Sequence, residues 1–163
     1  NHLDMSGNKK IKNANPKEYN GIQFKSMLEV MVYKTLLLEG ITPEYETHTY
    51  LIWEGFIPTI PFLTKNTLKR KDKRCTPLSR STMMVHKPIN GITYTPDFYF
   101  ELDGKKVIIE AKGVPNDVYP YKFKMFRTYL EEQPDKDAYV IWEIHTKKQL
   151  LECLNHLRQS LSQ

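Results

Sequence analysis

The fold is decided by residues 94–113, which read Tyr94-Thr95-Pro96-Asp97-Phe98-Tyr99-Phe100-Glu101-Leu102-Asp103-Gly104-Lys105-Lys106-Val107-Ile108-Ile109-Glu110-Ala111-Lys112-Gly113. Two runs rich in aromatic and β-branched residues flank the pair Asp103-Gly104. Asp-Gly between such runs is a strong hairpin signal, because a type I′ turn needs positive φ at both central positions. The stretch therefore predicts two antiparallel strands joined by a two-residue turn.

A two-residue turn also determines which residues of the two strands face each other. Leu102 would lie opposite Lys105 beside the turn. Counting outward from that pair, Asp97 would lie opposite Glu110, unless a bulge interrupts the ladder. Side chains alternate between the faces of a strand, so Lys112 would share the face of Glu110. The hairpin thus predicts two carboxylates with an ammonium group beside them.

Two carboxylates placed opposite each other need something to offset their repulsion. Directly opposed side chains lie roughly 4.5–5.5 Å apart at Cβ, and like charges there are destabilising. One solution is a proton held by a carboxyl group of raised pKa, and another is a hard divalent cation, which prefers oxygen ligands. In a third, one carboxylate turns into solvent while Lys112 or Lys106 neutralises the other. The residues alone leave all three open.

Length and composition narrow the class of protein. A chain of 163 residues is long enough for one domain with a substantial core. We find no apolar run of about 18 residues and no secretory signal pattern, so we expect no membrane partner. Cys75 and Cys153 form no metal-binding spacing, which argues against a zinc site. Free thiols suit a reducing cytoplasm.

Positive charge is concentrated in one segment. The net charge is +5, but residues 65–87 contain eight basic residues and a single acid, Asp72, so the remainder is mildly acidic. A localised basic segment indicates a polyanionic partner, although a solvated loop has the same composition. The basic residues are Lys65, Lys69, Arg70, Lys71, Lys73, Arg74, Arg80 and Lys87.

The remaining patterns predict alternating helices and strands. Apolar spacings of three and four predict helices over residues 22–39, 120–132 and 147–159, the last with Thr146 as its N-cap. Strands are predicted over residues 44–53 and 138–145. This order is typical of an α/β domain with a mixed sheet flanked by helices. We expect a flexible arm over residues 1–20, of which 1–4 are an expression remnant, and a single domain over residues 21–163 with a basic insertion at about 55–90.

Two of these helices carry charged residues whose roles the pattern leaves open. Glu29 lies on the otherwise apolar first helix, where it could pair with Lys25 at the surface. On the helix over residues 120–132, Lys122, Lys124 and Arg127 alternate with aromatic residues. That alternation is typical of ordinary amphipathic packing and equally of a helix that contacts phosphates.

The motifs resemble those of the PD-(D/E)xK nuclease superfamily, whose signature places Pro-Asp at the start of one strand and Glu-x-Lys in the next. The matching residues here are Pro96-Asp97 and Glu110-Ala111-Lys112. Within that superfamily, the chain is most similar to the phage endonuclease I family of Holliday-junction resolvases and to related phage nuclease-like proteins, over roughly residues 24–145. The closer resemblance is carried by residues 94–98 and 110–113, Glu29, Gly40-Ile41 and Tyr45-Glu46.

The resemblance implies a restriction-endonuclease-like fold and a metal-dependent endodeoxyribonuclease that hydrolyses DNA phosphodiester bonds, with selectivity for branched DNA. It also implies that the catalytic residues are Glu29, Asp97, Glu110 and Lys112. Mg²⁺, which Mn²⁺ could replace, would be held by Asp97, Glu110 and the backbone carbonyl of Ala111, with Glu29 contributing directly or through water.

The partners implied are DNA and a second copy of the chain, bridged by residues 51–63, in the cytoplasm of a phage-infected or other bacterial cell. Phosphate contacts would come from Lys69, Arg70, Lys71, Lys73, Arg74, Lys122, Lys124 and Arg127.

The basic insertion is longer than expected in the endonuclease I family, which leaves the substrate and the oligomeric state open. The main alternative is a catalytically inactive nucleic-acid-binding module with the same fold. A structure-independent nickase, a restriction-like enzyme and a protein that binds an acidic protein surface through residues 65–87 are further alternatives. The choice between DNA and RNA, and between one metal ion and two, is also open.

Overall fold

The computed structural model describes residues 17–60, 62–65, 82–84, 88–114 and 116–163. They divide into two compact units, each considered by itself: the sheet unit, up to residue 52 and from residue 93 on, and the inserted unit, residues 53–92. Outside the described residues lie residues 1–16 and the predicted DNA-binding residues Lys69, Arg70, Lys71, Lys73 and Arg74. No helix within the described ranges is long and apolar enough to cross a membrane.

The hairpin at Asp103-Gly104 lies at the centre of the sheet unit. Strands β8 (Phe98–Leu102) and β9 (Lys105–Ala111) are antiparallel, and their pairing includes Leu102 with Lys105 and Tyr99 with Ile108. Asp103 and Gly104 have φ angles of 47° and 79°, as a type I′ turn requires. The turn and the register predicted from the sequence are therefore confirmed.

β8 and β9 are the inner strands of a mixed sheet with the order β10-β9-β8-β3. β10 (Tyr139–Ile144) runs parallel to β9, whereas β3 (Glu44–Tyr45) runs antiparallel to β8. A parallel pair needs a long crossover connection, which here contains α3 (Tyr119–Glu131) and the 3₁₀ turn η1 (Lys136–Ala138). The mixed α/β class predicted from the sequence is confirmed.

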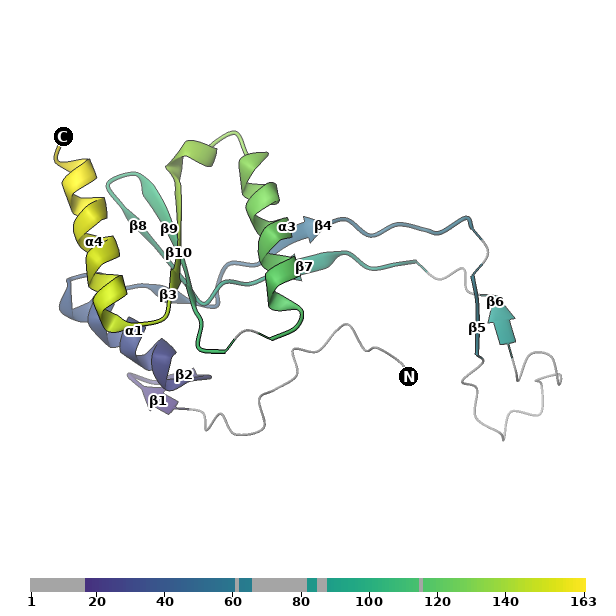
Figure 1. Cartoon of the computed structure of the whole chain (residues 1–163), viewed down its shortest axis with the longest axis horizontal. Helices are drawn as coiled ribbons and strands as arrows, with labels where there is room; N and C mark the ends of the chain where they lie inside the picture. The colour runs from purple at the N-terminus through teal and green to yellow at the C-terminus, as the bar shows by residue number, and fades with distance from the viewer. Residues whose placement is uncertain (1–16, 61, 66–81, 85–87, 115) are drawn as a thin grey trace. The chain divides into compact units, whose positions relative to one another are not determined.

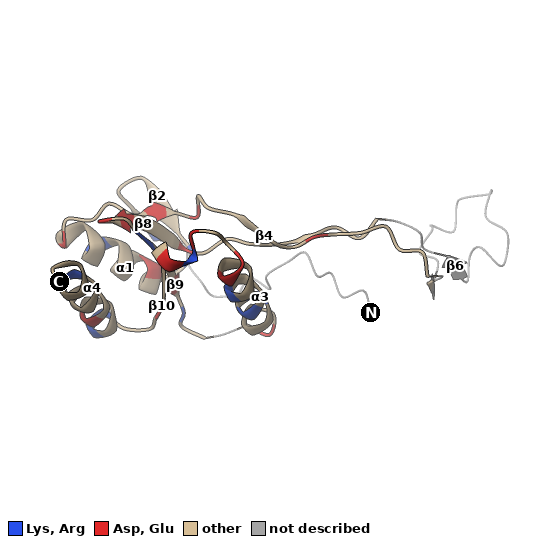
Figure 2. Ribbon diagram, turned by 90° about the horizontal axis from the view of Figure 1, so that it is seen from above, with Lys and Arg blue, Asp and Glu red and all other residues tan. Residues whose placement is uncertain are grey.

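Helices cover both faces of this sheet. α1 (Met27–Leu38) and α4 (Lys147–Leu161) lie on one side of the strands and α3 lies on the other (Figures 1 and 2). Alternation along β8 divides its side chains between two apolar cores: Phe98 and Phe100 pack with α1 and α4, whereas Tyr99 packs with α3. The sheet is thus enclosed by apolar contacts on both faces.

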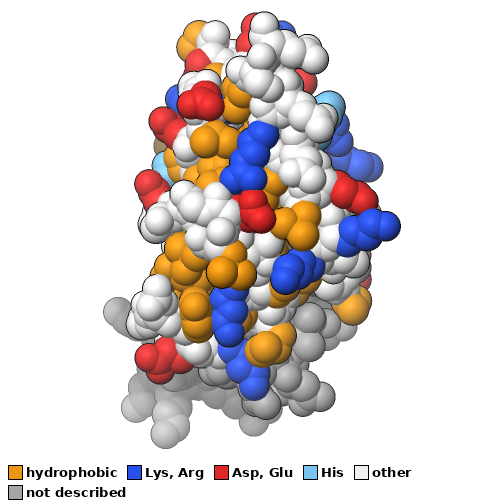
Figure 3. All heavy atoms as spheres, turned by 90° about the vertical axis from the view of Figure 1, so that its left-hand side faces the viewer, with side chains coloured by type: hydrophobic (Ala, Val, Ile, Leu, Met, Phe, Trp, Pro, Cys, Tyr) orange, Lys and Arg blue, Asp and Glu red, His pale blue; other side chains and the backbone are white. Residues whose placement is uncertain are grey.

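The outer surface of the sheet unit is chemically mixed. On the face that Figure 3 shows, lysine and arginine side chains are interspersed with acidic and apolar ones. Such a mixture is typical of a solvated protein surface, much of which is apolar in any folded protein.

The N-terminal part of the sheet unit differs from the sequence prediction. The helix expected over residues 22–39 begins only at Met27, because Ile22–Phe24 forms β2, antiparallel to β1 (Lys17–Tyr19). Asn20 and Gly21 between them have φ angles of 57° and 77°, and Asn-Gly is a hairpin signal of the same kind as Asp-Gly. The expected flexible arm therefore ends in a strand.

The strand expected over residues 44–53 is interrupted at Glu46, whose φ angle is 52°. The interruption separates β3 from β4 (Tyr50–Trp53), which pairs with β7 (Ile92–Tyr94). The predicted helices over residues 120–132 and 147–159 and the strand over 138–145 are confirmed to within two residues as α3, α4 and β10. Thr146 caps α4 as expected, accepting a hydrogen bond from the backbone N–H of Gln149 at 3.1 Å.

The described residues of the inserted unit form two extended runs. β5 (Leu63–Lys65) and β6 (Thr82–Met84) are antiparallel, and Phe56 forms an isolated bridge with Ile89. A Cβ atom at Gly55 would overlap the carbonyl oxygen of Ile89, so the glycine permits the close approach of the two runs. Large apolar side chains are exposed in this unit: Trp53, Phe56, Ile57, Ile60, Phe62 and Ile89.

Substituting Gly104→Ala is expected to lower the free energy of unfolding by about 1–2 kcal/mol, because an L-residue is disfavoured by about that much in the left-handed region. The new Cβ would meet no other atom within 4 Å, so the cost is conformational rather than steric. Gly113→Ala is the control, since its Cβ also meets open space but its φ lies outside the left-handed region. Urea unfolding measures both, and equal losses of stability would contradict the turn assignment.

Candidate active site

A cavity of about 470 Å³ lies in the sheet unit, where β8, β9 and the start of α1 come together. Its lining includes all four residues proposed from the sequence as catalytic: Glu29, Asp97, Glu110 and Lys112. Ala111, whose carbonyl was proposed as a further ligand, also lines the cavity, as does Glu46. The two acids of the hairpin therefore face one shared space.

Asp97 immediately precedes β8 and is anchored through its backbone and its side chain. Its carbonyl oxygen accepts a hydrogen bond from the N–H of Glu46 at 2.9 Å, and its Oδ2 accepts one from the N–H of Ala111 at 2.8 Å. This side-chain hydrogen bond joins the start of β8 to the end of β9. It holds the carboxylate beside the Glu-Ala-Lys segment, where the hairpin register predicts it.

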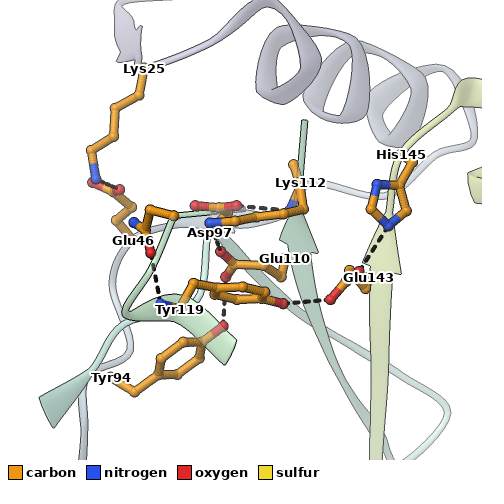
Figure 4. Close-up of polar contacts among 11 residues, drawn as sticks. Lys25, Glu46, Tyr94, Asp97, Glu110, Lys112, Tyr119, Glu143 and His145 are labelled. Carbon is orange, nitrogen blue, oxygen red and sulfur yellow. Dashed lines mark hydrogen bonds and ion pairs between the residues drawn. The ribbon is translucent and has the colours of Figure 1, made fainter. Parts of the chain in front are cut away.

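Glu110 is held by one neutral donor and one cation (Figure 4). Its Oε2 accepts a hydrogen bond from the Tyr94 hydroxyl at 2.6 Å, and its Oε1 lies 3.5 Å from Nζ of Lys112. The Tyr94 ring is stacked on Phe126 of α3, with 4.5 Å between the ring centroids. α3 covers the face of the sheet that Ile108 and Glu110 share, so it helps to position the carboxylate.

Burial dominates the electrostatics of the two acids. Desolvation raises the pKa of Asp97 well above its ordinary value, and the negative charges of Glu110 and Glu29 raise it further. Burial also raises the pKa of Glu110, against the opposing effects of the Tyr94 hydroxyl and Lys112. The favourable contacts of the two acids therefore do not offset the cost of burying their charges.

One of the three solutions considered for the opposed acids is wrong. Neither carboxylate turns into solvent, because Asp97 is 9% exposed and Glu110 is 7% exposed. Lys106 does not reach them, since its ammonium group binds Asp135 at 2.7 Å. A retained proton and a bound cation are the two solutions that agree with the raised pKa values.

Glu29 combines a structural contact with a place in the cavity. Its backbone N–H donates to the hydroxyl of Ser26, the N-cap of α1, at 3.2 Å. Its Oε2 accepts hydrogen bonds from the backbone N–H of Lys25 and from the Tyr45 hydroxyl, each at 2.8 Å. The surface pair of Glu29 with the Lys25 ammonium is wrong, because Glu29 is buried and that ammonium binds Glu46 instead.

The basic residues of α3 divide between the cavity and the surface. Lys122 lines the cavity, whereas Lys124 and Arg127 are exposed. Phe126 and Leu130 are buried against the sheet, so the amphipathic packing of this helix is confirmed. Contact of its cations with phosphate stays a prediction.

Several residues of the site were not singled out from the sequence. Tyr94 was noted only as part of a motif, and Tyr119 and Glu143 were given no role, although the Tyr119 hydroxyl donates to Oε2 of Glu143 at 2.7 Å (Figure 4). These two residues are 24 positions apart, so no local spacing relates them. Glu46 could have been found through its place beside Tyr45 in the matched motif.

The donor set suits a hard cation that keeps several waters. Among the residues that the structure describes, no group of three or more His, Cys, Asp or Glu side chains is arranged to hold a metal ion. Asp97 and Glu110 supply two carboxylates, and the Ala111 carbonyl is a third oxygen. Mg²⁺ typically takes one or two protein carboxylates and completes its shell with water.

Comparison of the chain with protein-family models, with curated proteins and with solved structures found no match. The fold and the cavity define a mixed α/β domain with buried carboxylates in a cavity that three lysines also line, among them Lys112. The assignment of a reaction to this site therefore depends on its own residues and their chemistry.

The raised pKa values predict how stability depends on pH in the absence of divalent ions. Folded Asp97 keeps its proton to higher pH than the unfolded chain does, where the pKa is 3.8. Its stabilising contribution is therefore complete below about pH 4 and is lost as the pH rises through the folded pKa. Asp97→Asn removes this pH-dependent loss of stability, because the amide stays neutral. Its oxygen can still accept the hydrogen bond from the Ala111 N–H.

Urea unfolding in EDTA should therefore show Asp97→Asn gaining stability over the wild type as the pH is raised from 4 to 8. Glu101→Gln removes an exposed carboxylate from β8, outside the cavity, and should follow the wild-type profile. A wild type that becomes more stable relative to Asp97→Asn as the pH rises would contradict the raised pKa of Asp97.

Proposed function

We propose that the protein is a metal-dependent endodeoxyribonuclease of the PD-(D/E)xK type with a restriction-endonuclease-like fold. The observation that carries the proposal is the meeting of Asp97, Glu110 and Lys112 in one cavity, where burial raises the pKa of both acids. Phosphodiester hydrolysis requires an attacking water, stabilisation of the phosphoryl charge and few other protein groups. This residue set supplies those functions once a cation is bound.

Mg²⁺ is the proposed cofactor, with Mn²⁺ able to replace it. Asp97, Glu110 and the Ala111 carbonyl would hold the ion. Glu29 would contribute directly or through water, with its Oε2 held by the Lys25 N–H and the Tyr45 hydroxyl. When bound, the ion supplies Lewis-acid chemistry, polarising the phosphate and acidifying water.

Lys112 supplies the positive charge that the protein itself contributes to the reaction. Its ammonium group lies beside Glu110 and its side chain is largely buried. An ammonium in such surroundings donates hydrogen bonds to the attacking water or to phosphoryl oxygens as negative charge develops there. The fixed charge is more effective in a cavity with little water than at the surface.

DNA would be held mainly through its phosphates. Lys122 is at the cavity, and Lys124 and Arg127 continue along α3 (blue in Figure 2). The predicted contacts from Lys69, Arg70, Lys71, Lys73 and Arg74 lie outside the described residues. Contacts of this kind give affinity and orientation with little sequence information, which suits an enzyme selecting DNA by shape in a bacterial cytoplasm.

Cleavage should require a divalent ion and Asp97. Wild-type protein is expected to cut DNA with Mg²⁺ or Mn²⁺ and not with EDTA, and Asp97→Asn should slow cutting at least about a thousandfold, because several kcal/mol of transition-state stabilisation are lost. DNA affinity should persist. The assay uses a four-way junction, a flap, linear duplex and single-stranded DNA, with Glu101→Gln as the active control.

A fully active Asp97→Asn protein would overturn this assignment. Salt-sensitive DNA binding without cleavage in any ion would instead indicate the inactive nucleic-acid-binding module. Preference for the four-way junction over linear duplex would support the resolvase-like substrate.

The resolvase-like activity further suggests a homodimer, because symmetric cutting of two strands favours two-fold symmetry. The exposed apolar side chains Phe56, Ile57, Ile60 and Phe62 support a contact through residues 51–63, since such patches mark interaction surfaces. Sedimentation velocity should show a dimer that Ile60→Lys shifts toward monomer. Leu38→Lys, at an exposed position of α1, should leave the dimer intact, and a monomeric wild type with and without branched DNA would contradict the contact.

A further inference from the structure

The Lys112 ammonium group is held from two sides. Its Nζ lies 3.9 Å from the centroid of the Tyr119 ring, and 3.5 Å from Oε1 of Glu110 (Figure 4). A cation within about 6 Å of a ring centroid is attracted by the negative face of the ring. The lysine therefore has an aromatic contact in addition to its carboxylate contact.

The Tyr119 ring is itself fixed by three independent contacts. The backbone N–H of Tyr119 donates to Oδ1 of Asn116 at 2.7 Å, which anchors the start of α3. The hydroxyl donates to Oε2 of Glu143 at 2.7 Å. The ring is stacked with Phe123, with 5.3 Å between centroids and 24° between planes. A tyrosine held through its backbone N–H, one face of its ring and its hydroxyl has little freedom to move.

Glu143 is fixed in turn by the sheet. It lies on β10 at the position paired with Glu110 on β9, and its Oε1 lies 2.8 Å from Nε2 of His145. Both oxygens of Glu143 are therefore engaged, one with Tyr119 and one with His145. The adjacent carboxylates of the two strands thus hold different partners: Glu110 is beside the lysine, and Glu143 holds the ring over which the lysine lies.

A lysine needs such support because its long side chain has many rotamers and because three buried acids attract its charge. Glu110, Asp97 and Glu29 all line the cavity, and contact with one acid alone would let the ammonium group move among them. A ring on one side and Glu110 on the other restrict it to one position. A pre-positioned group loses less conformational freedom at the moment of reaction.

We propose that Tyr119 is a positioning residue, which holds the Lys112 ammonium group at the carboxylate pair while Glu143 anchors its hydroxyl. The effect on cleavage rests on the proposed nuclease function, whereas the placement of the lysine does not. The competing explanation is that Tyr119 only fills the core formed with Tyr94 and Phe126.

NMR of the full-length protein separates the two explanations without any assay of cleavage. Protons next to Nζ of Lys112 should be shifted upfield, because they lie over an aromatic face. Tyr119→Leu should remove that shift, whereas Tyr119→Phe keeps the ring but loses its hydrogen bond to Glu143 and should reduce it. Tyr129→Leu, which removes a tyrosine from the same helix but leaves Lys112 untouched, should leave the shift unchanged. Glu143→Ala should reduce it by loosening the ring, and provides the test if Tyr119→Leu does not fold.

Single-turnover cleavage at saturating DNA tests the consequence for rate. Tyr119→Leu should cut about tenfold more slowly with unchanged DNA affinity, in keeping with the strength of a partly desolvated cation–π contact. Tyr119→Phe, which keeps the ring but not its anchor to Glu143, should restore part of the rate. A Lys112 signal unchanged in folded Tyr119→Leu, or a rate equal to that of Tyr129→Leu, would overturn the proposal. A wild type without cleavage would refute the nuclease function, and the NMR comparison would still decide the role of Tyr119.

Discussion

The structure depends on the burial of Asp97 and Glu110 beside each other, where β8 begins and β9 ends. This arrangement is unfavourable by itself, because desolvation and mutual repulsion both oppose ionisation of the two groups. The tight turn at Asp103-Gly104 imposes it through the register of the hairpin. Apolar cores on both faces of the sheet keep that hairpin in place. The stability of the fold therefore holds the two acids together against their repulsion.

Tyrosine hydroxyls hold two acids of the cavity and a third acid on the neighbouring strand β10. Tyr45 donates to Glu29, Tyr94 to Glu110 and Tyr119 to Glu143. A phenol is a neutral donor, so it fixes the direction of a carboxylate without cancelling its charge. An arginine or lysine in these places would orient the acids equally well but would leave less negative charge for a cation. The choice of donor therefore agrees with a site whose charge is meant for a ligand.

Local patterns were sufficient to predict the centre of this fold and not its edges. The turn, the register and the meeting of Asp97, Glu110 and Lys112 follow from short-range chemistry, whereas Glu29 was assigned to the site only through the family resemblance. The start of α1 was misplaced because Phe24 fits the helical spacing of Leu28 and Met31, although the Asn20-Gly21 turn precedes it. Tyr119 and Glu143 were missed because the crossover between β9 and β10 brings them together. Residues that meet only through the tertiary fold show no periodic pattern in the sequence.

The division of the chain into two units has an evolutionary consequence. Every residue that lines the carboxylate cavity belongs to the sheet unit, although the inserted unit interrupts that unit between residues 52 and 93. We therefore expect changes of length within the inserted unit to be tolerated more readily than changes in the sheet unit, because no described residue of the cavity is drawn from it.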